Sequence, residues 1–238
     1  FIELLSVDST NNYAMALAHE GVAQHGTTIF ARQQTAGKGQ RSKTWTAEPG
    51  ANIIMSVVLE PKEQPLSSAF TLSMAMAVAV QQFFAQYASF ETKVKWPNDL
   101  YWRDRKAGGI LIENIVQGPL WRYAIVGIGI NINQTGFEGL PDAVSLKQIT
   151  GKDFDTVALA KDLCTFVQKG FEAFVENGTA VHQAYHEHLY KMNEEVKLKQ
   201  DGRVFTTTIK GVTSLGRLIT YHNAEEFFDI GDVEWVHS

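Results

Sequence analysis

Apolar runs alternate with longer helical patterns through the first 190 residues, and this order predicts an α/β domain. Runs at 27–33, 52–59 and 122–133 have the length and the β-branched content of buried strands. Residues 66–87 and 155–176 instead repeat apolar positions at helical spacing. Strands and helices therefore interleave, as expected for a sheet that is covered by helices.

An edge strand and a helix are expected before the first of these runs. Residues 2–7 alternate weakly between apolar and polar, and a cluster of capping residues follows them. Ser9 or Thr10 is expected to cap a helix that Gly21 ends.

Glycines interrupt the strongest strand pattern in the chain. Residues 106–113 and 122–133 predict a hairpin, and four glycines stand in it where side chains are expected: Gly108, Gly109, Gly127 and Gly129. Missing side chains let another group lie flat against a sheet. Tight packing of a helix would explain one such glycine, but four on paired strands favour contact with a ligand.

Pro97 interrupts another strand pattern, at 93–101. Because proline cannot donate to a ladder, the strand is expected to bulge or bend there and to aim Asn98 and Asp99 out of regular pairing.

From Asn193 onward the pattern changes to short alternating strands, separated by turn residues such as Asp201-Gly202. This pattern predicts a small second domain over residues 191–238. So few residues bury too little surface to be stable alone, and we therefore expect this domain to dock on residues 1–190.

A polar loop at 33–45 lies between two predicted strands and carries the clearest chemical signal. Its glycines allow a ligand to approach the backbone closely, and Lys38, Arg41 and Lys43 bring three positive charges to one turn. Trp45 adds a flat face that is suited to stacking on a base. The loop therefore predicts an anion-binding cradle.

A Walker-type P-loop is excluded for this segment. The spacing from Gly37 to Lys43-Thr44 nearly matches that motif, but Ser42 takes the place of the second glycine. A P-loop must also open a helix, whereas a strand pattern follows here.

Composition indicates an ordinary globular protein, with 238 residues, 45% hydrophobic and 20% charged, and a net charge of −5. No nucleic-acid-binding surface is expected from this charge. The single cysteine, Cys164, excludes an internal disulfide and a cysteine-built zinc site. Residues 64–90 carry no charge, but the Ser, Thr and Gln among them favour a buried helix over a membrane span. We see no signal peptide, so we expect a cytoplasmic protein that does not bind membranes.

His182 and His186 stand one helical turn apart in a helix predicted over 179–190. Such a pair can bind a metal, but no carboxylate at the H-E-x-x-H spacing accompanies it. A solvated helix face is therefore the favoured interpretation.

Five motifs occur in order: Asp8-Ser9-Thr10-Asn11, then Gln34 with Gly37 to Trp45, Lys95-Trp96-Pro97-Asn98-Asp99, Lys106-Ala107-Gly108-Gly109-Ile110-Leu111, and Gly127-Ile128-Gly129-Ile130-Asn131. With them the chain resembles the biotin protein ligases of the biotin and lipoate ligase superfamily over essentially its whole length. It resembles the type without an N-terminal DNA-binding domain, because the catalytic strand is expected at the start of the sequence. We therefore expect no DNA partner.

The resemblance implies a mixed-sheet catalytic domain like that of class II aminoacyl-tRNA synthetases, followed by an SH3-like β-barrel. It implies that biotin and ATP are substrates and give biotinyl-5′-AMP, from which biotin passes to a lysine of a biotin carboxyl carrier protein. Mg²⁺ is expected with ATP, although its ligands are not identified by the sequence. An exposed sheet edge would also allow a homodimer.

The resemblance also implies roles for individual residues. Those implied for biotin are Ser9, Thr10, Asn11, Gln34, Gly37, Lys38, Gly39, Gln40, Lys106, Gly109 and Gly127, and Lys106 is the implied catalytic residue. Those implied for ATP and the adenylate are Arg41, Lys43, Trp45, Asn98, Asp99 and Asn131. The chemistry requires such cations, since two like unit charges at ~4 Å repel by roughly 4 kcal/mol at an effective dielectric near 20.

The loop departs from the family pattern at three positions. Lys38 and Gln40 stand where arginine is common, and Ser42 stands where glycine is common. Point charges would then replace a bidentate grip on phosphate.

Two other functions compete with this interpretation. A lipoate ligase or octanoyltransferase shares the fold and an essential lysine, but its acyl-chain site would be apolar, whereas Ser9, Thr10 and Gln34 supply polar partners for a ureido ring. A non-catalytic biotin sensor would bind without turnover, and the presence of Lys106 with the full set of cations argues against it.

Overall fold

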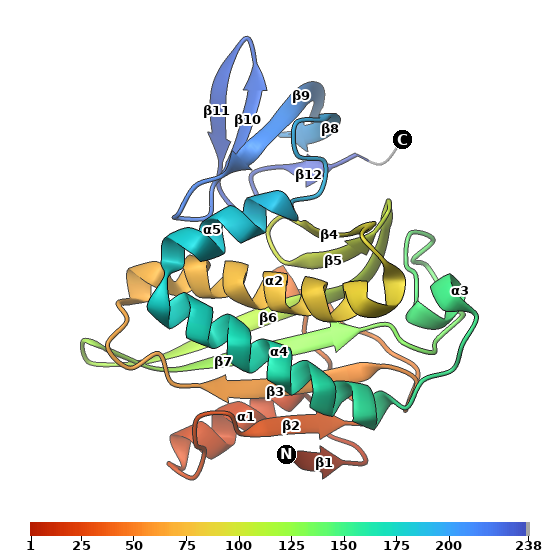
Figure 1. Cartoon of the computed structure of the whole chain (residues 1–238), viewed down its shortest axis with the longest axis vertical. Coiled ribbons are helices and arrows are strands. Elements are labelled where there is room, and N and C mark those ends of the chain that lie inside the picture. Colours follow the sequence, from red (N-terminus) through yellow and green to blue (C-terminus); the bar gives the residue numbers. More distant parts are fainter. Residues whose placement is uncertain (237–238) are drawn as a thin grey trace.

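A seven-stranded sheet forms the centre of the molecule in the computed structural model, which describes residues 1–236 apart from the side chain of Ser42 (Figure 1). Its strands are β1 (Ile2–Leu4), β2 (Thr28–Ala31), β3 (Ile53–Leu59), β4 (Thr92–Lys95), β5 (Asp99–Trp102), β6 (Arg105–Gln117) and β7 (Leu120–Ile130), in the spatial order β1-β2-β3-β7-β6-β5-β4. β1 is parallel to β2, and all other neighbours are antiparallel. The predicted α/β class with a mixed sheet is confirmed.

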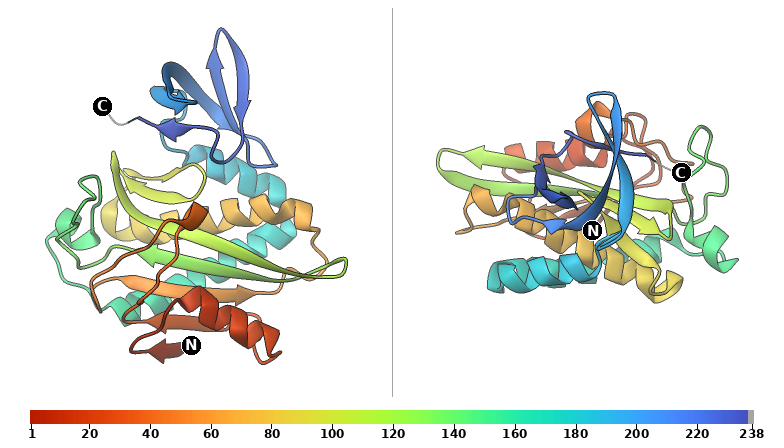
Figure 2. Two further views of the ribbon diagram at one scale, coloured as in Figure 1. Left: turned by 180° about the vertical axis from the view of Figure 1, so that it is seen from behind. Right: turned by 90° about the horizontal axis from the view of Figure 1, so that it is seen from above.

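Helices cover both faces of this sheet (Figures 1 and 2). On one face lie α2 (Ala69–Ala88), α4 (Thr156–Glu176) and α5 (Gly178–Glu187), and on the other lies α1 (Thr10–His19). Alternate side chains of β3 pack into the helix layers on the two faces of the sheet, because successive residues of a strand point to opposite faces. Met55 and Val57 belong to the larger core under α2 and α4, whereas Val58 packs with the α1 layer.

α2 is the helix that the sequence predicted as buried, and this prediction is confirmed. With the turn before it, the segment Leu66–Ala88 is long and apolar enough to cross a membrane by length and composition, but most of its apolar stretch is buried inside the protein. Met76 and Phe83 are fully buried. α4 approaches so closely that a Cβ on Gly170 would lie 3.0 Å from the Cβ of Ala79.

A second sheet follows α5. It consists of β8 (Glu195–Gln200), β9 (Arg203–Val212), β10 (Leu218–His222), β11 (Ala224–Phe228) and β12 (Glu234–Trp235), in the antiparallel order β11-β10-β9-β8-β12. Within residues 1–236 the end strands β11 and β12 are not paired with each other. The sheet is therefore open, and the predicted closed barrel is not confirmed.

The second sheet docks on the part of the chain that precedes it, as expected, and backbone groups make several of the contacts. Trp96 Nε1 donates a hydrogen bond to the Gly216 carbonyl at 2.9 Å. His182 Nε2 lies 2.8 Å from the Val212 carbonyl oxygen, and His186 Nε2 accepts from the Val212 N–H at 2.9 Å. The prediction that both histidines line a solvated helix face is wrong, because α5 turns this face toward β9. No group of three metal-ligating side chains gathers in the described part of the chain.

Two local elements differ from the sequence-based expectation. The segment 93–101 is not one bent strand but the β4–β5 hairpin, because the chain reverses at the cis Trp96–Pro97 bond. A short helix, α3 (Leu146–Thr150), was not anticipated, although Ser145 and Gln148 form a capping box at its start.

The burial of α2 gives a stability prediction. Phe83→Ala should lower the free energy of unfolding by about 3–5 kcal/mol, because Phe83 is fully buried and packs edge-on against Tyr87 and Phe166. Phe90→Ala, just beyond the helix, is the matched control, since Phe90 is 86% exposed and should change stability by less than about 0.5 kcal/mol. Denaturant titration of both variants measures the difference, and equal losses would contradict this packing of α2.

Candidate functional site

The candidate site lies on the α1 face of the sheet, beside that helix. The left view of Figure 2 shows the loop between β2 and β3 crossing this face over β6 and β7. Beneath the loop is a cavity of about 430 Å³, lined by Ala36, Gly37, Lys38, Gly39, Lys43, Thr44, Leu111 and Glu113. Its volume falls within the range of small-molecule sites.

The loop forms a small hairpin of its own. Trp45 N donates to the Gly37 carbonyl at 2.9 Å, and Gly39 N donates to the Lys43 carbonyl at 2.7 Å. A 3₁₀ turn at Gln40–Ser42 closes the tip. A Cβ on Gly37 would lie only 2.3 Å from the Trp45 carbonyl oxygen, so a side chain at this position would force the hairpin open.

A polar network joins the start of α1 to the sheet. Gln34 Oε1 accepts from the Thr10 N–H at 2.7 Å and from the Thr10 hydroxyl at 3.0 Å. Ser56 Oγ lies 2.7 Å from Thr10 Oγ1 and 2.6 Å from Asn11 Oδ1. Because a hydroxyl has one proton, Ser56 can donate to only one of these oxygens at a time. Asn11 Nδ2 donates to Glu113 at 2.7 Å, which completes the chain of contacts.

Glu113 links this network to the loop, since its other carboxylate oxygen lies 3.6 Å from Lys38 Nζ. Neither Ser56 nor Glu113 was predicted as a site residue. Each is a polar residue within a run of apolar strand residues, and this contrast is the sequence signal that could have identified them.

Side chains of the protein itself cover two of the bare positions on β7. A Cβ on Gly127 would lie 2.3 Å from Asn11 Oδ1, and a Cβ on Gly129 would lie 2.6 Å from the Trp45 indole. The sequence favoured a ligand against these glycines, whereas Asn11 and Trp45 pack there in this structure. Among the described residues, the buried Trp45 Nε1 has no hydrogen-bond partner.

Lys106 and Asp99 form an ion pair on the same face, with 2.7 Å between Nζ and Oδ1. Asp99 stands opposite Gly109 in the β5–β6 ladder, and a Cβ on Gly109 would lie 3.2 Å from Asp99 Oδ1. A register shift after Leu100 places Lys106 opposite Tyr101. The two side chains remain 37% and 27% exposed, so a ligand can reach the pair from solvent.

Lys95 lies beside this pair but is buried. Its Nζ donates to the Tyr101 hydroxyl at 3.0 Å and lies 5.0 Å from the ring centroid of Trp235, in the second sheet. Burial lowers the pKa of Lys95 to about 8, against the smaller opposing effect of the Asp99 charge. Burial also raises the pKa of Tyr101 well above its usual value.

Two residues predicted at the adenylate hold backbone segments in place. Asn98 Nδ2 donates to the Ile110 carbonyl, which ties the β4–β5 turn to β6. Asn131 Nδ2 donates to the Val144 carbonyl at 3.2 Å, at the end of β7. Both side chains are buried.

The remaining predicted residues separate into two groups. Lys38 and Lys43 line the cavity, whereas Arg41 Nη1 donates to the Gly231 carbonyl at 3.2 Å, between β11 and β12. The structure thus directs Arg41 to the second sheet. Ser9 is buried at the N-cap of α1, and Gln40 begins the turn at the loop tip.

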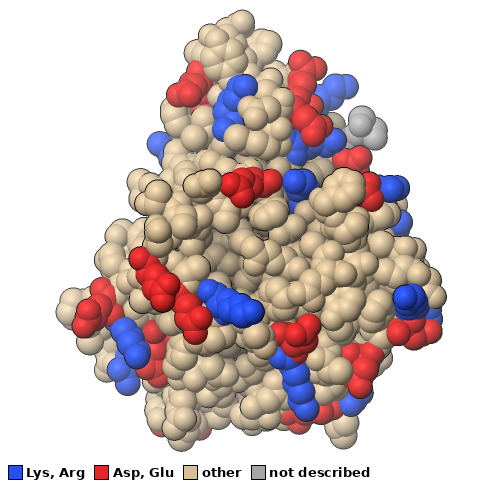
Figure 3. Space-filling view, in the orientation of Figure 1, with Lys and Arg blue, Asp and Glu red and all other residues tan. Residues whose placement is uncertain are grey.

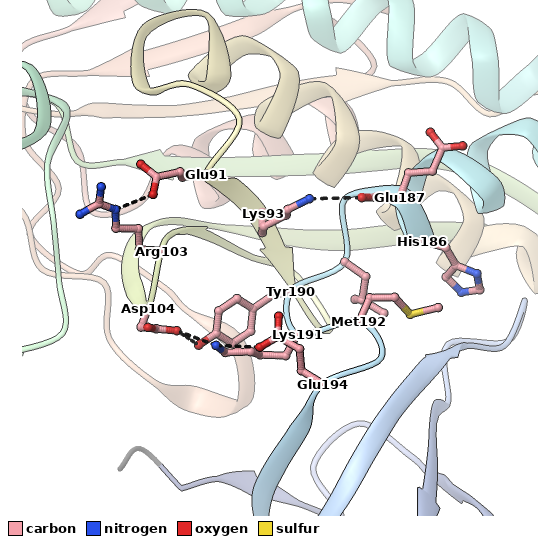
Figure 4. A pocket seen from close by; sticks show the side chains of 11 residues that line it. Glu91, Lys93, Arg103, Asp104, His186, Glu187, Tyr190, Lys191, Met192 and Glu194 are labelled. Carbon is pink, nitrogen blue, oxygen red and sulfur yellow. Dashed lines mark hydrogen bonds and ion pairs between the residues drawn. The ribbon is translucent and has the colours of Figure 1, made fainter.

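A larger cavity, of about 500 Å³, lies between the β4–β5 hairpin and the end of α5 (Figure 4). Its charges are largely paired with one another: Arg103 Nε lies 2.7 Å from Glu91, and Lys191 Nζ lies 3.3 Å from Asp104 and 3.1 Å from Glu194. Paired charges have less to offer an ionic ligand. In the cavity under the loop Lys38 is paired with Glu113, but Lys43 forms no ion pair with the described residues, so this cavity is the better candidate.

The face of the sheet opposite α1 carries a mixture of charges. Figure 3 shows side chains of both signs interspersed over this helix-covered face. An extended basic surface of the kind that nucleic acids require is not seen in this view of the described residues.

Residues 4–131 match the model of the biotin/lipoate A/B protein ligase family. The bifunctional ligase/repressor BirA of Bacillus subtilis is 34% identical over 177 residues, which are 72% of this chain and 54% of that protein. The biotin–[acetyl-CoA-carboxylase] ligase of Mycobacterium tuberculosis is 37% identical over 141 residues, which are 58% of this chain and 51% of that protein. The chain thus spans about half the length of these curated relatives.

A solved structure extends the likeness to the whole described fold. The biotin protein ligase from Aquifex aeolicus in complex with biotin and ATP has a TM-score of 0.81 at 26% identity, and the match covers 100% of this chain and 98% of that one. The resemblance inferred from the five sequence motifs is therefore confirmed. Because the family model covers more than half of the sequence, the chain belongs to the biotin/lipoate A/B protein ligase family.

Proposed function

We propose that the protein is a biotin–protein ligase, which activates biotin with ATP as biotinyl-5′-AMP and transfers it to a lysine of a biotin carboxyl carrier protein. The observation that carries this proposal is the accessible Lys106–Asp99 ion pair. It lies on the same face of the sheet as the cavity under the loop that contains Lys38 and Lys43. Lys106 Nζ lies on the face to which Gly109 points, since a Cβ on Gly109 would be 3.7 Å from it. Leu111 is two residues further along β6 and therefore points to the same face. The Aquifex aeolicus ligase, whose fold this chain shares, was solved with biotin and ATP.

In the first step a biotin carboxylate oxygen attacks the α-phosphorus of ATP, and the bond to pyrophosphate breaks. The carboxylate must approach a polyanion, so the chain has to supply positive charge. Lys106 leaves Asp99 and binds the reacting oxygens, while Lys38 and Lys43 bind the phosphates from the loop. These residues act by positioning and by electrostatic stabilisation of the transition state.

In the second step the amine of the carrier lysine attacks the acyl carbon of the adenylate. The C–N bond forms, AMP leaves with the electrons of the C–O bond, and the amine releases a proton. The mixed anhydride also reacts with water, so the loop over the cavity has to exclude solvent until the carrier arrives.

The polar network supports biotin rather than a simple acyl chain as substrate. The ureido ring of biotin carries N–H donors and a carbonyl acceptor, which lose free energy if they are buried without partners. Gln34, Thr10 and Asn11 offer such partners near the cavity, with Ser9 at the same end of α1. An apolar acyl chain would offer these groups no hydrogen bonds in exchange for those that they make with one another.

Other parts of the proposal concern the ions and the surroundings of the reaction. Mg²⁺ would accompany ATP and supply positive charge at the phosphates. Trp45 would stack on the adenine, and Arg41 would bind phosphate after leaving Gly231.

Five further points remain predictions: the division at residues 190 and 191, the likeness to class II synthetases, an SH3-like second domain, a cytoplasmic location and a homodimer.

Replacement of the proposed catalytic lysine tests the chemistry. Lys106→Ala should lower the rate of biotinyl-5′-AMP formation by about 100-fold or more, because the reacting oxygens lose their nearest cation. The adenylate is measured by chromatography with biotin, ATP and Mg²⁺, and transfer is measured separately by supplying biotinyl-5′-AMP with a carrier domain.

Lys152→Ala, at an exposed loop position, is the matched control and should retain the wild-type rate. An undiminished rate in Lys106→Ala would show that another group handles the carboxylate. A wild-type protein that binds biotin but never forms the adenylate would instead support a biotin sensor.

Loss of the acceptor at the head of α1 should weaken biotin binding. Gln34→Leu removes the oxygen that accepts from Thr10, and we expect a 10- to 100-fold higher Kd for biotin, on the order of 1.5–3 kcal/mol for disrupted buried hydrogen bonds. Gln33→Leu, at the adjacent exposed position, is the control and should bind as the wild type does. Titration calorimetry measures both, and equal affinities would remove Gln34 from the site.

A further inference from the structure

Asp99 has lysines on both sides of it in the sheet. Lys106 Nζ lies 2.7 Å from Asp99 Oδ1. Lys95 is paired with Asp99 across the β4–β5 ladder, and residues paired in this way point to the same face with their Cβ atoms roughly 5 Å apart. Asp99 therefore has a lysine from each neighbouring strand near it, one in an ion pair and one close enough for their charges to interact.

The two lysines differ in their freedom to move. Lys95 is only 5% exposed, and its Nζ lies 4.6, 6.0 and 5.0 Å from the ring centroids of Tyr101, Tyr190 and Trp235. Aromatic faces at such distances attract a cation and hold it in place. The side chain of Lys106, in contrast, is 37% exposed. Lys95 is therefore a fixed charge, whereas Lys106 can turn toward a ligand.

We propose that Lys95 is a positioning residue for adenylate formation, whose fixed charge stays with Asp99 and allows Lys106 to leave that carboxylate for the substrate. This inference rests on the proposed ligase function and assigns a role to a residue that does not itself touch the substrate.

The physical reason is the cost of an uncompensated carboxylate in a partly buried site. When Lys106 turns to the biotin carboxylate and the α-phosphate, Asp99 loses its nearest counter-charge. A carboxylate left alone in such surroundings is unfavourable, so Asp99 would hold Lys106 back. The charge of Lys95 remains nearby and reduces this cost. Without it, the Lys106–Asp99 pair would be tighter and the site would carry one positive charge fewer.

A double-mutant cycle tests this role. Lys95→Met should lower kcat/KM for biotinyl-5′-AMP formation by about tenfold, the factor that corresponds to one pKa unit of charge interaction. In an Asp99→Asn background the same replacement should change kcat/KM by less than about twofold, because the neutral amide no longer retains Lys106. A loss of the same factor in both backgrounds would overturn the proposal, since it would indicate a purely structural role.

Matched variants separate the charge of Lys95 from its packing. Lys93→Met removes a lysine from the same strand and face, where Nζ donates to the Glu187 carbonyl at 3.3 Å, and should leave the rate near that of the wild type. Lys95→Gln keeps a polar group for the Tyr101 hydroxyl without the charge, and should behave as Lys95→Met does. Thermal unfolding of each variant checks that it is folded. An inactive wild-type protein would refute the ligase function itself, whereas an active one with additive losses would refute only this inference.

The pH profile is an independent readout that also serves if neither Lys95 variant folds. The charged and titratable groups that act on Lys95 or face it are Asp99, Lys106, Asp142, Lys43, Tyr101 and Tyr190. Since the pKa of Lys95 is lowered to about 8, Lys95 loses its charge as the pH rises through that value. Adenylate formation by the wild type should fall along this limb, and the limb should be absent from Lys95→Met. A wild-type rate that stays constant from pH 7 to 9 would contradict the proposal, as would a limb that persists in Lys95→Met.

Discussion

The hydrogen-bonded register of β5, β6 and β7 is the constraint on which the candidate site depends. It places Asp99 opposite Gly109, and Gly109 opposite Gly129. The Asp99 carboxylate therefore stands next to two neighbouring positions that have no side chain. A slip of one residue in any of these strands would turn the whole set to the other face, into the core under α2. The large apolar core therefore fixes the register, and the register in turn fixes the polar face.

Charge at the site comes from two parts of the fold, the sheet and the loop that crosses it. The sheet supplies Asp99, Lys95 and Lys106 from neighbouring strands, whereas Lys38 and Lys43 come from a loop that is held by its own hydrogen bonds and by Glu113. The proposed reaction between two anions needs positive charge throughout, but the reactants must also enter and leave. A sheet that holds some of the charges in place and a separate loop that carries the others meet both needs.

Local patterns predicted the parts of the fold that local sequence determines, including α2, α4 and the β6–β7 hairpin. The open second sheet and the side of α5 that carries His182 could not be predicted, because they depend on contacts between distant segments. The site shows the same division. Family motifs led to the prediction of Asn11 as a site residue, but its partners Ser56 and Glu113 lie 45 and 102 residues away, and no local pattern connects them.

The hydrogen bond from Arg41 to Gly231 joins the tip of the loop to a turn near the end of the chain. Lifting the loop must therefore break a contact made by the second sheet, and the activation barrier for opening includes a contribution from residues that never meet the reactants. Turnover limited by product escape would then respond to sequence changes around that distant turn, although the affinity for either reactant stayed the same.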